Sequence, residues 1–148
     1  MNLKEKLTAD LKEAMKQGDA VRKETIRALR GAIRNAEIDR GRELTGAELL
    51  DVIARQAKQR RDSIEQYRRG NRPDLVEQES RELAVIETYL PRQLTDDEIA
   101  ARADAVIAEL GVTGMKGMGA VMKRLTTELK GRADGKRISQ IVRQRLSR

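Results

Sequence analysis

Apolar residues recur every three to four positions along most of this 148-residue chain, and charged residues fill the positions between them. That spacing places apolar side chains on one face of a helix, whereas a half-buried strand would show strict alternation. Glycine or proline interrupts the pattern at intervals, which divides the chain into predicted helices. They cover residues 3–17, 19–40, 46–69, 73–90, 96–110, 119–130 and 134–147. The pattern therefore predicts an all-α protein.

Signals for the start of a helix support these boundaries. Residues 45–48 (Thr-Gly-Ala-Glu) and 95–98 (Thr-Asp-Asp-Glu) are each predicted to form a capping box, in which threonine and glutamate satisfy two free backbone amides. Asp19 and Asp134 are expected to be N-caps. The chain has two tyrosines and no other aromatic residue. The core must therefore consist mainly of aliphatic side chains, which suit helices better than sheets.

The predicted helix at 19–40 has two contrasting faces. The face expected to be buried contains Val21, Ala28, Leu29, Ala32, Ile33 and Ala36. A basic stripe lies nearly opposite, and it contains Lys23, Arg27, Arg30 and Arg34. The stripe could follow the phosphates of a nucleic acid. A solvated outer face is the favoured interpretation, because most runs of charge are solvated.

Two charged residues interrupt apolar stripes on neighbouring predicted helices. Arg60 lies within the stripe of helix 46–69, and Glu79 lies within that of helix 73–90. Both are about equally far from Gly70, where a helical hairpin is expected to turn. A charge among apolar positions needs a partner or a function. We therefore predict a buried Arg60–Glu79 ion pair rather than a catalytic carboxylate.

Pro91 marks the expected boundary between two domains, since proline ends a helix. The segment before it carries four predicted helices and the segment after it carries three. The sequence thus predicts a four-helix N-terminal domain at residues 1–93 and a three-helix C-terminal domain at residues 94–148.

The chain contains neither cysteine nor histidine, which excludes thiol chemistry, disulfides and nearly all zinc and haem sites. No serine has a histidine partner, so no catalytic residue is assigned, and neither a cofactor nor a metal is expected. The acids at residues 96–98 could hold a hard cation, but stabilisation of a helix N-terminus explains them better. The chain lacks a long apolar run and its N-terminus does not resemble a signal peptide. These features predict a cytoplasmic protein with no membrane partner.

Positive charge gathers at the end of the chain. The whole chain has a net charge of +7, while residues 111–148 alone hold ten Lys or Arg and two acids. Such a surplus suggests an acidic partner such as nucleic acid. The residues expected to contact phosphates are Lys116, Lys123, Lys130, Arg132, Lys136, Arg137 and Arg143.

Glycine is concentrated between residues 111 and 135, which contain six of the eleven glycines. The spacing is not that of a P-loop or a dinucleotide fingerprint, and no strand is predicted before it. Gly111 and Gly131 are expected to stop helices. For residues 114–119 two interpretations remain open: tight turns between short helices, or backbone amides that hold a phosphate.

The two glycine-rich segments resemble the signature of the GatB/YqeY family. The resemblance rests on Met118, Gly119, Val121, Met122, Gly131, Ala133, Asp134 and Gly135. Residues 58–65 and 89–94 also resemble the N-terminal half of free-standing YqeY proteins, so the similarity spans nearly the whole chain. One departure is Gly117, where the family pattern has an acidic residue before Met-Gly. That acid would cap the next helix or contact a partner.

The resemblance implies a tRNA-binding accessory protein with a role in translation and without an active site of its own. In this family the tail module is associated with tRNA recognition beside glutamine-dependent amidation, a carbon–nitrogen ligase activity whose catalytic parts lie elsewhere. The implied partners are tRNA and an aminoacyl-tRNA synthetase or amidotransferase component. Two alternatives stay open. One is a protein–protein adaptor with a basic helical tail, and the other is an amidotransferase component that is active only in a complex.

Overall fold

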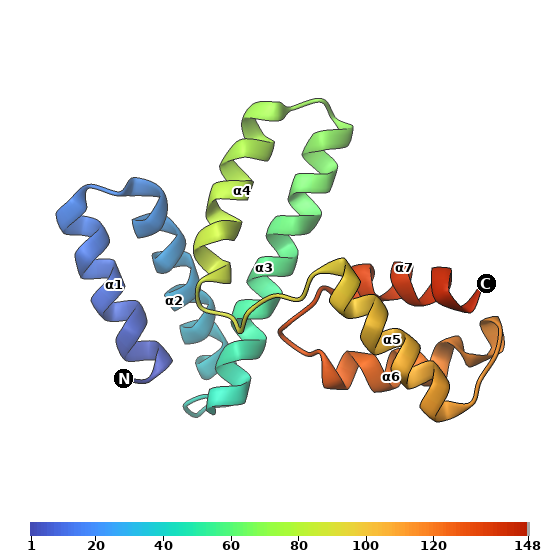
Figure 1. Ribbon diagram of the computed structural model, residues 1–148. Helices are drawn as coiled ribbons and strands as arrows, with labels where there is room; N and C mark the ends of the chain where they lie inside the picture. Colours follow the sequence, from blue (N-terminus) through green and yellow to red (C-terminus); the bar gives the residue numbers. More distant parts are fainter. Residues whose placement is uncertain (148) are drawn as a thin grey trace. The chain divides into compact units, whose positions relative to one another are not determined.

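The computed structural model describes residues 1–147, and these residues form α-helices and one short 3-10 helix with no strand (Figure 1). The all-α prediction is confirmed. The elements in chain order are α1 (Leu3–Gln17), α2 (Ala20–Arg40), α3 (Gly46–Arg69), α4 (Pro73–Glu87), α5 (Asp96–Leu110), η1 (Met115–Gly117), α6 (Met118–Glu128) and α7 (Gly135–Leu146).

Local caps explain most of these boundaries. The side chain of Asp19 accepts a hydrogen bond from the amide of Arg22 at the start of α2. Both predicted capping boxes, at residues 45–48 and 95–98, are present. Helices α1, α2 and α5 each end at a glycine with φ between 64° and 69°, a left-handed conformation that glycine adopts without strain.

Two predicted helices end at least two residues earlier in the structure, and one of them is α6, which ends at Glu128 rather than residue 130. Helix α4 ends at Glu87 rather than residue 90, and the hydroxyl of Thr88 donates to the carbonyl of Val85 at 2.6 Å. The turn that follows places Tyr89 in the core, where its hydroxyl donates to Asp10 at 2.5 Å. Asp134 precedes α7 as predicted, but its side chain makes no capping hydrogen bond to that helix.

The chain forms two compact units, Met1–Pro91 with α1 to α4 and Arg92–Arg148 with α5 to α7. The division into two domains at residues 93 and 94 stays a prediction, because compactness alone does not show independent folding.

In the first unit α2 lies between α1 and the antiparallel pair α3–α4 (Figure 1). The buried face of α2 differs from the prediction: Ala28 is exposed, whereas Thr25 and Ile26 are buried. Because α2 packs against α1 and also against α3 and α4, the buried part of its surface is wider than one apolar stripe. The core contains Leu7, Leu11, Ile26, Leu29, Ile33, Leu44, Leu49, Ile53, Ala57, Ile86 and Tyr89.

The predicted ion pair of Arg60 is confirmed and has a further member. The Nε atom of Arg60 lies 3.6 Å from an oxygen of Glu79 and 3.3 Å from an oxygen of Glu82. The three side chains are 17%, 19% and 22% exposed. Burial, with repulsion from Glu82, raises the pKa of Glu79 above its ordinary value despite the opposing effect of Arg60. One largely buried cation therefore lies within ion-pair distance of two carboxylates, although its Nε makes no hydrogen bond within residues 1–147.

The second unit is a bundle in which α5, α6 and α7 pack against one another. Every helix contributes several aliphatic side chains, and the aromatic residues of the chain lie elsewhere. The core contains Ile99, Ala100, Ala103, Val106, Val121, Leu125, Leu129, Ile138, Ile141, Val142 and Leu146.

Acid should weaken the start of α5, because Glu98 acts there both as a capping residue and as an ion-pair partner. The guanidinium of Arg92, at 2.9 and 2.8 Å, and the Thr95 amide lower the pKa of Glu98 from 4.5 to about 2. A depressed pKa stabilises the folded state above the unfolded value of 4.5, and that stability is lost as the pH falls towards 2. We expect Glu98→Gln, which can still cap the helix, to lose less stability than the wild type across this window.

Circular dichroism melting curves at a series of pH values would measure this difference. Asp97→Asn is the matched control, because Asp97 lies in the same first turn and has no ion pair within residues 1–147. An identical pH dependence in the wild type and Glu98→Gln would contradict the expectation.

Candidate nucleic-acid interface

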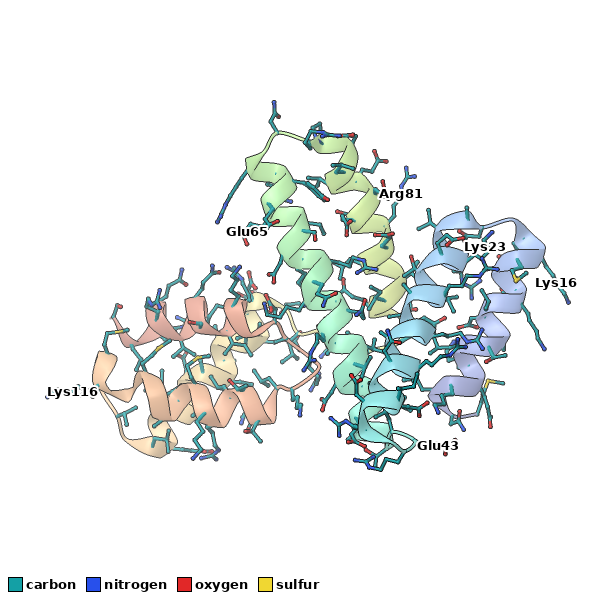
Figure 2. The ribbon with its side chains drawn as sticks, turned by 180° about the vertical axis from the view of Figure 1, so that it is seen from behind. Lys16, Lys23, Glu43, Glu65, Arg81 and Lys116 are labelled. Atoms are coloured by element: carbon teal, nitrogen blue, oxygen red, sulfur yellow. The ribbon has the colours of Figure 1, made fainter. Side chains whose placement is uncertain are left out.

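The core of the second unit determines which cations of α6 reach solvent. Val121, Leu125 and Leu129 recur every four residues and are buried. Lys123 lies on the exposed side of the helix, and Lys130 is exposed in the turn that follows the helix, seven residues later. Lys116 precedes them by another seven residues, on η1, and Figure 2 shows its side chain extending from the end of the unit. We call Lys116, Lys123 and Lys130 the α6 row.

The core also determines which cations of α7 reach solvent. Ile138, Ile141, Val142 and Leu146 are buried against α5 and α6. Lys136 and Arg143 are exposed and also seven residues apart, so they lie on a similar side of α7. We call these two residues the α7 row. All five cations of the two rows were predicted to contact phosphates.

Other cations of this unit are bound to the acids of α5 and α6. Arg124 contacts Glu109 at 2.6 Å, and Arg102 contacts Glu128 at 2.6 Å. Arg137, one of the predicted phosphate contacts, donates to Asp96 from two nitrogens. The hydrogen bonds from Arg137 lower the pKa of Asp96. Arg137 is therefore already engaged by a carboxylate, and a phosphate would have to compete for it.

The remaining predicted residues differ in how accessible they are. Arg132 is half-buried, and its Nε donates to the carbonyl of Arg92 at 3.3 Å. Lys116, Lys123 and Arg143 are exposed and form no ion pair within the described part of the chain. These three side chains are the cations most available to an external anion. The sequence did not reveal this ranking, because the competing acids lie 15 to 41 residues away.

The glycine-rich loop before α6 is shaped by sterics at two positions. Gly114 has φ of 67°, which favours glycine. Gly117 is buried, and a Cβ atom there would lie 2.6 Å from Cγ2 of Val112. A side chain at residue 117 would need Val112 to move, so the departure from the family pattern fits the local packing of this chain. The tight-turn interpretation therefore explains both residues.

Neither backbone conformation nor packing explains why glycine occupies the positions of Gly119 and Gly135. Each lies in the first turn of a helix, at α6 and α7, with a negative φ and open space where a Cβ would be. In a helix interior glycine is less stable than alanine by about 0.5–1 kcal/mol, and a smaller loss applies at the start of a helix. Packing does not account for this loss, whereas the close approach of a ligand to the backbone would.

We expect Gly119→Ala and Gly135→Ala each to raise the free energy of unfolding by up to about 1 kcal/mol. If these positions lie against bound RNA, the same substitutions should lower the affinity for tRNA, because a methyl group would separate the backbone from the phosphates. Chemical denaturation and fluorescence anisotropy would measure the two effects.

Gly117→Ala is the steric control, and we expect it to destabilise the protein by about 1–3 kcal/mol through its clash with Val112. Unchanged tRNA affinity in stabilised Gly119→Ala and Gly135→Ala variants would show that the two glycines are not binding positions.

The other family-motif residues have structural roles. Val121 is buried, and Met118, Met122 and Ala133 pack against the same core. Gly131 has φ of 78°, and its carbonyl accepts a hydrogen bond from the side-chain amide of Gln93 at 2.8 Å. The motif therefore fixes the α6–α7 connection on the segment before α5.

The described residues contain no group of three or more potential metal ligands. No single helix among them has the length and apolarity to cross a membrane, although α5 and η1–α6 together, bent by 94°, meet that test by composition and length. The candidate site is a basic surface.

The fold and this surface define a class: small all-helical proteins with a basic three-helix unit at the C-terminal end of the chain. The family model described as "Yqey-like protein" matches residues 4–146, and the chain belongs to that family.

Curated relatives are similar over much of the chain. "Altered inheritance of mitochondria protein 41, mitochondrial" of Lachancea thermotolerans is 41% identical over 107 residues, which cover 70% of this chain and 57% of that protein. The protein of the same name from Pyrenophora tritici-repentis is 33% identical over 147 residues, which cover 94% of this chain and 78% of that protein. The chain spans less than two thirds of the length of several of these relatives.

The names of these relatives correct the predicted location. The sequence suggested a cytoplasmic protein, but the similar proteins are named as mitochondrial. The cytoplasmic prediction relied on the composition of the chain and its first residues, and neither feature identifies a compartment.

Proposed function

We propose that this YqeY-family protein binds tRNA through its second unit, as an accessory protein related to the tail of tRNA-dependent amidotransferases. In this proposal, residues 1–93 and 94–148 are separate four-helix and three-helix domains. The observation that carries the proposal is the set of exposed cations Lys116, Lys123 and Arg143, which form no ion pair within residues 1–147. The glycines at the starts of α6 and α7, which have no packing role, add support.

The chemistry of this surface favours contacts with the phosphate backbone. Both tyrosines of the chain lie in the first unit, so the second unit offers no aromatic side chain on which a base could stack. Lysine and arginine bind phosphates without reading sequence directly. Recognition would therefore depend on the shape of a folded RNA, which is how proteins commonly bind double-stranded RNA.

The direct test is a titration of labelled tRNA with the full chain at several salt concentrations. Each phosphate contact contributes roughly 0.7–0.9 to the slope of log affinity against log salt. We expect a slope that reflects a few contacts, and an absence of salt-dependent binding would contradict the proposal.

A protein–protein adaptor is the second candidate. Its supporting observation is apolar exposure beside the basic surface: Leu110 is 38% exposed and Met115 is 48% exposed. Apolar side chains next to cations suit an acidic protein partner better than RNA alone. Recovery of a protein partner from a nuclease-treated lysate, without tRNA binding by the purified chain, would favour the adaptor.

A further inference from the structure

The basic stripe of α2 is not uniform in the structure. Lys23 and Arg27 both lie near the carboxylate of Glu24, at 3.7 and 3.6 Å. Arg30 and Arg34 pair with no acid among residues 1–147. The prediction of a merely solvated stripe therefore describes its first half, and its second half has different surroundings.

Arg30 and Arg34 line a pocket of about 210 Å³ between α1 and α2. The aliphatic side chains of Leu7 and Ile33, both nearly inaccessible to solvent, also line it. The ammonium of Lys4 and the carboxylate of Glu37 complete the charged part of the lining. Three cations and one anion thus share the pocket, and the imbalance favours an anionic ligand.

The one carboxylate of the pocket is already satisfied. Glu37 accepts hydrogen bonds from the ammonium of Lys4 at 2.5 Å and from the amide of Leu44 at 2.9 Å. These bonds lower the pKa of Glu37 below its ordinary value, so the group stays charged near neutral pH and remains bound to Lys4. Within residues 1–147 the two arginines have no comparable partner, so their guanidinium groups remain available.

We infer that the pocket between α1 and α2 binds a phosphate group through Arg30 and Arg34. The two residues are four apart on one helix, so both guanidinium groups can approach one anion from the same side. Guanidinium groups match the oxygen geometry of phosphate and hold it with paired hydrogen bonds.

The size of the pocket limits what accompanies the phosphate. Its volume of about 210 Å³ is about seven times the ~30 Å³ that one water occupies in the liquid. Drug-sized ligands usually occupy about 300–1,000 Å³. The pocket therefore accepts a phosphate with a small organic group, and the aliphatic lining suits the carbon atoms of that group. The phosphate comes either from a small phosphorylated molecule or from an RNA chain.

The test uses inorganic phosphate and the full chain. We expect phosphate, added at constant ionic strength, to raise the melting temperature saturably and to shift NMR signals of α1 and α2. Arg30→Gln with Arg34→Gln should weaken this binding about tenfold or more, because each lost contact is a hydrogen bond to a charged group.

Lys23→Gln with Arg27→Gln is the matched control. It removes the same charge from the same helix, and Figure 2 shows Lys23 at one end of the α1–α2 hairpin and Glu43 at the other. The pocket lies at the Glu43 end, since Lys4 is 4.0 Å from Glu43. We expect the control to change phosphate affinity less than twofold.

A parallel titration with tRNA identifies the source of the phosphate. If the Arg30/Arg34 variant loses phosphate binding but keeps its tRNA affinity, the ligand is a small molecule, and if it loses both, the pocket holds an RNA phosphate. Either result supports the inference that the pocket binds a phosphate group. Absence of saturable phosphate binding by the wild type, or equal losses in the two double variants, would overturn the inference. Neither overturning result affects the proposed tRNA surface, which depends on cations of the second unit.

Discussion

Replacing Arg60 by methionine should lower the free energy of unfolding by about 2–3 kcal/mol at pH 7. Removal of one partner from a buried ion pair commonly costs about 3–5 kcal/mol, because the other charge remains without compensation. Here the side chains of Glu79 and Glu82 would both remain, three residues apart on α4. Each is about a fifth exposed, so partial solvation reduces the effect. Methionine keeps most of the side-chain volume, which separates the loss of charge from the loss of packing.

The loss in free energy of unfolding caused by Arg60→Met should become smaller at acidic pH. Burial already raises the pKa of Glu79 above its unfolded value of 4.5, and loss of Arg60 would raise it further. A carboxyl group with a raised folded pKa contributes stability that is fully present below 4.5 and is lost as the pH rises through its folded pKa. Urea unfolding at pH 7, 6, 5 and 4.5 should therefore show the wild type and Arg60→Met converging as the pH falls.

Arg81→Met is the matched control for this experiment. Arg81 contacts Glu77 on the same helix at 2.5 Å, but both side chains are more than 60% exposed, and exposed pairs contribute about 0–1 kcal/mol. Figure 2 shows Arg81 extending from the surface of α4. Equal losses from the two substitutions, or a deficit for Arg60→Met that does not vary with pH, would show that the buried cluster has no special role.

The helices were predictable because their signals are local. A capping box spans four residues, and a glycine stop acts on the turn directly before it. The Arg60–Glu79 pair was predictable for a related reason, since a hairpin turn brings together positions at equal distances from it. Glu82 was not recognised as a member, because its position in the apolar pattern does not distinguish it from a solvated residue.

The candidate site was less predictable, because it depends on contacts between distant residues. Arg137 was expected to face a phosphate, but Asp96, 41 residues earlier, already binds it. The departure at Gly117 is explained by the side chain of Val112, a contact that no periodicity indicates. The unequal halves of the α2 stripe likewise depend on their neighbours: Glu24 of α2 lies near Lys23 and Arg27, whereas Arg30 and Arg34 line a pocket with residues of α1. Charge composition indicated a basic surface, but it did not indicate which of its cations lack an ion-pair partner among residues 1–147.

The most direct consequence of the proposed function is that reversing two free cations should greatly weaken tRNA binding. Lys123→Glu with Arg143→Glu changes exposed residues of α6 and α7 that form no ion pair in the described chain. If both contact phosphates, the loss should be on the order of a hundredfold, with about tenfold from each lost charged contact. The salt slope should fall by roughly 1.4–1.8, since each contact contributes about 0.7–0.9.

Lys12→Glu with Lys16→Glu provides the control, because it makes the same change in net charge on the exposed face of α1, where Figure 2 shows Lys16 at the surface. We expect this variant to keep most of its affinity and slope, and both variants to melt within a few degrees of the wild type. Equal losses in the two variants would mean that net charge alone attracts the RNA, without a defined surface. If neither variant differs from the wild type, the basic rows of the second unit do not bind tRNA, and the exposed Leu110 and Met115 make a protein partner the better explanation.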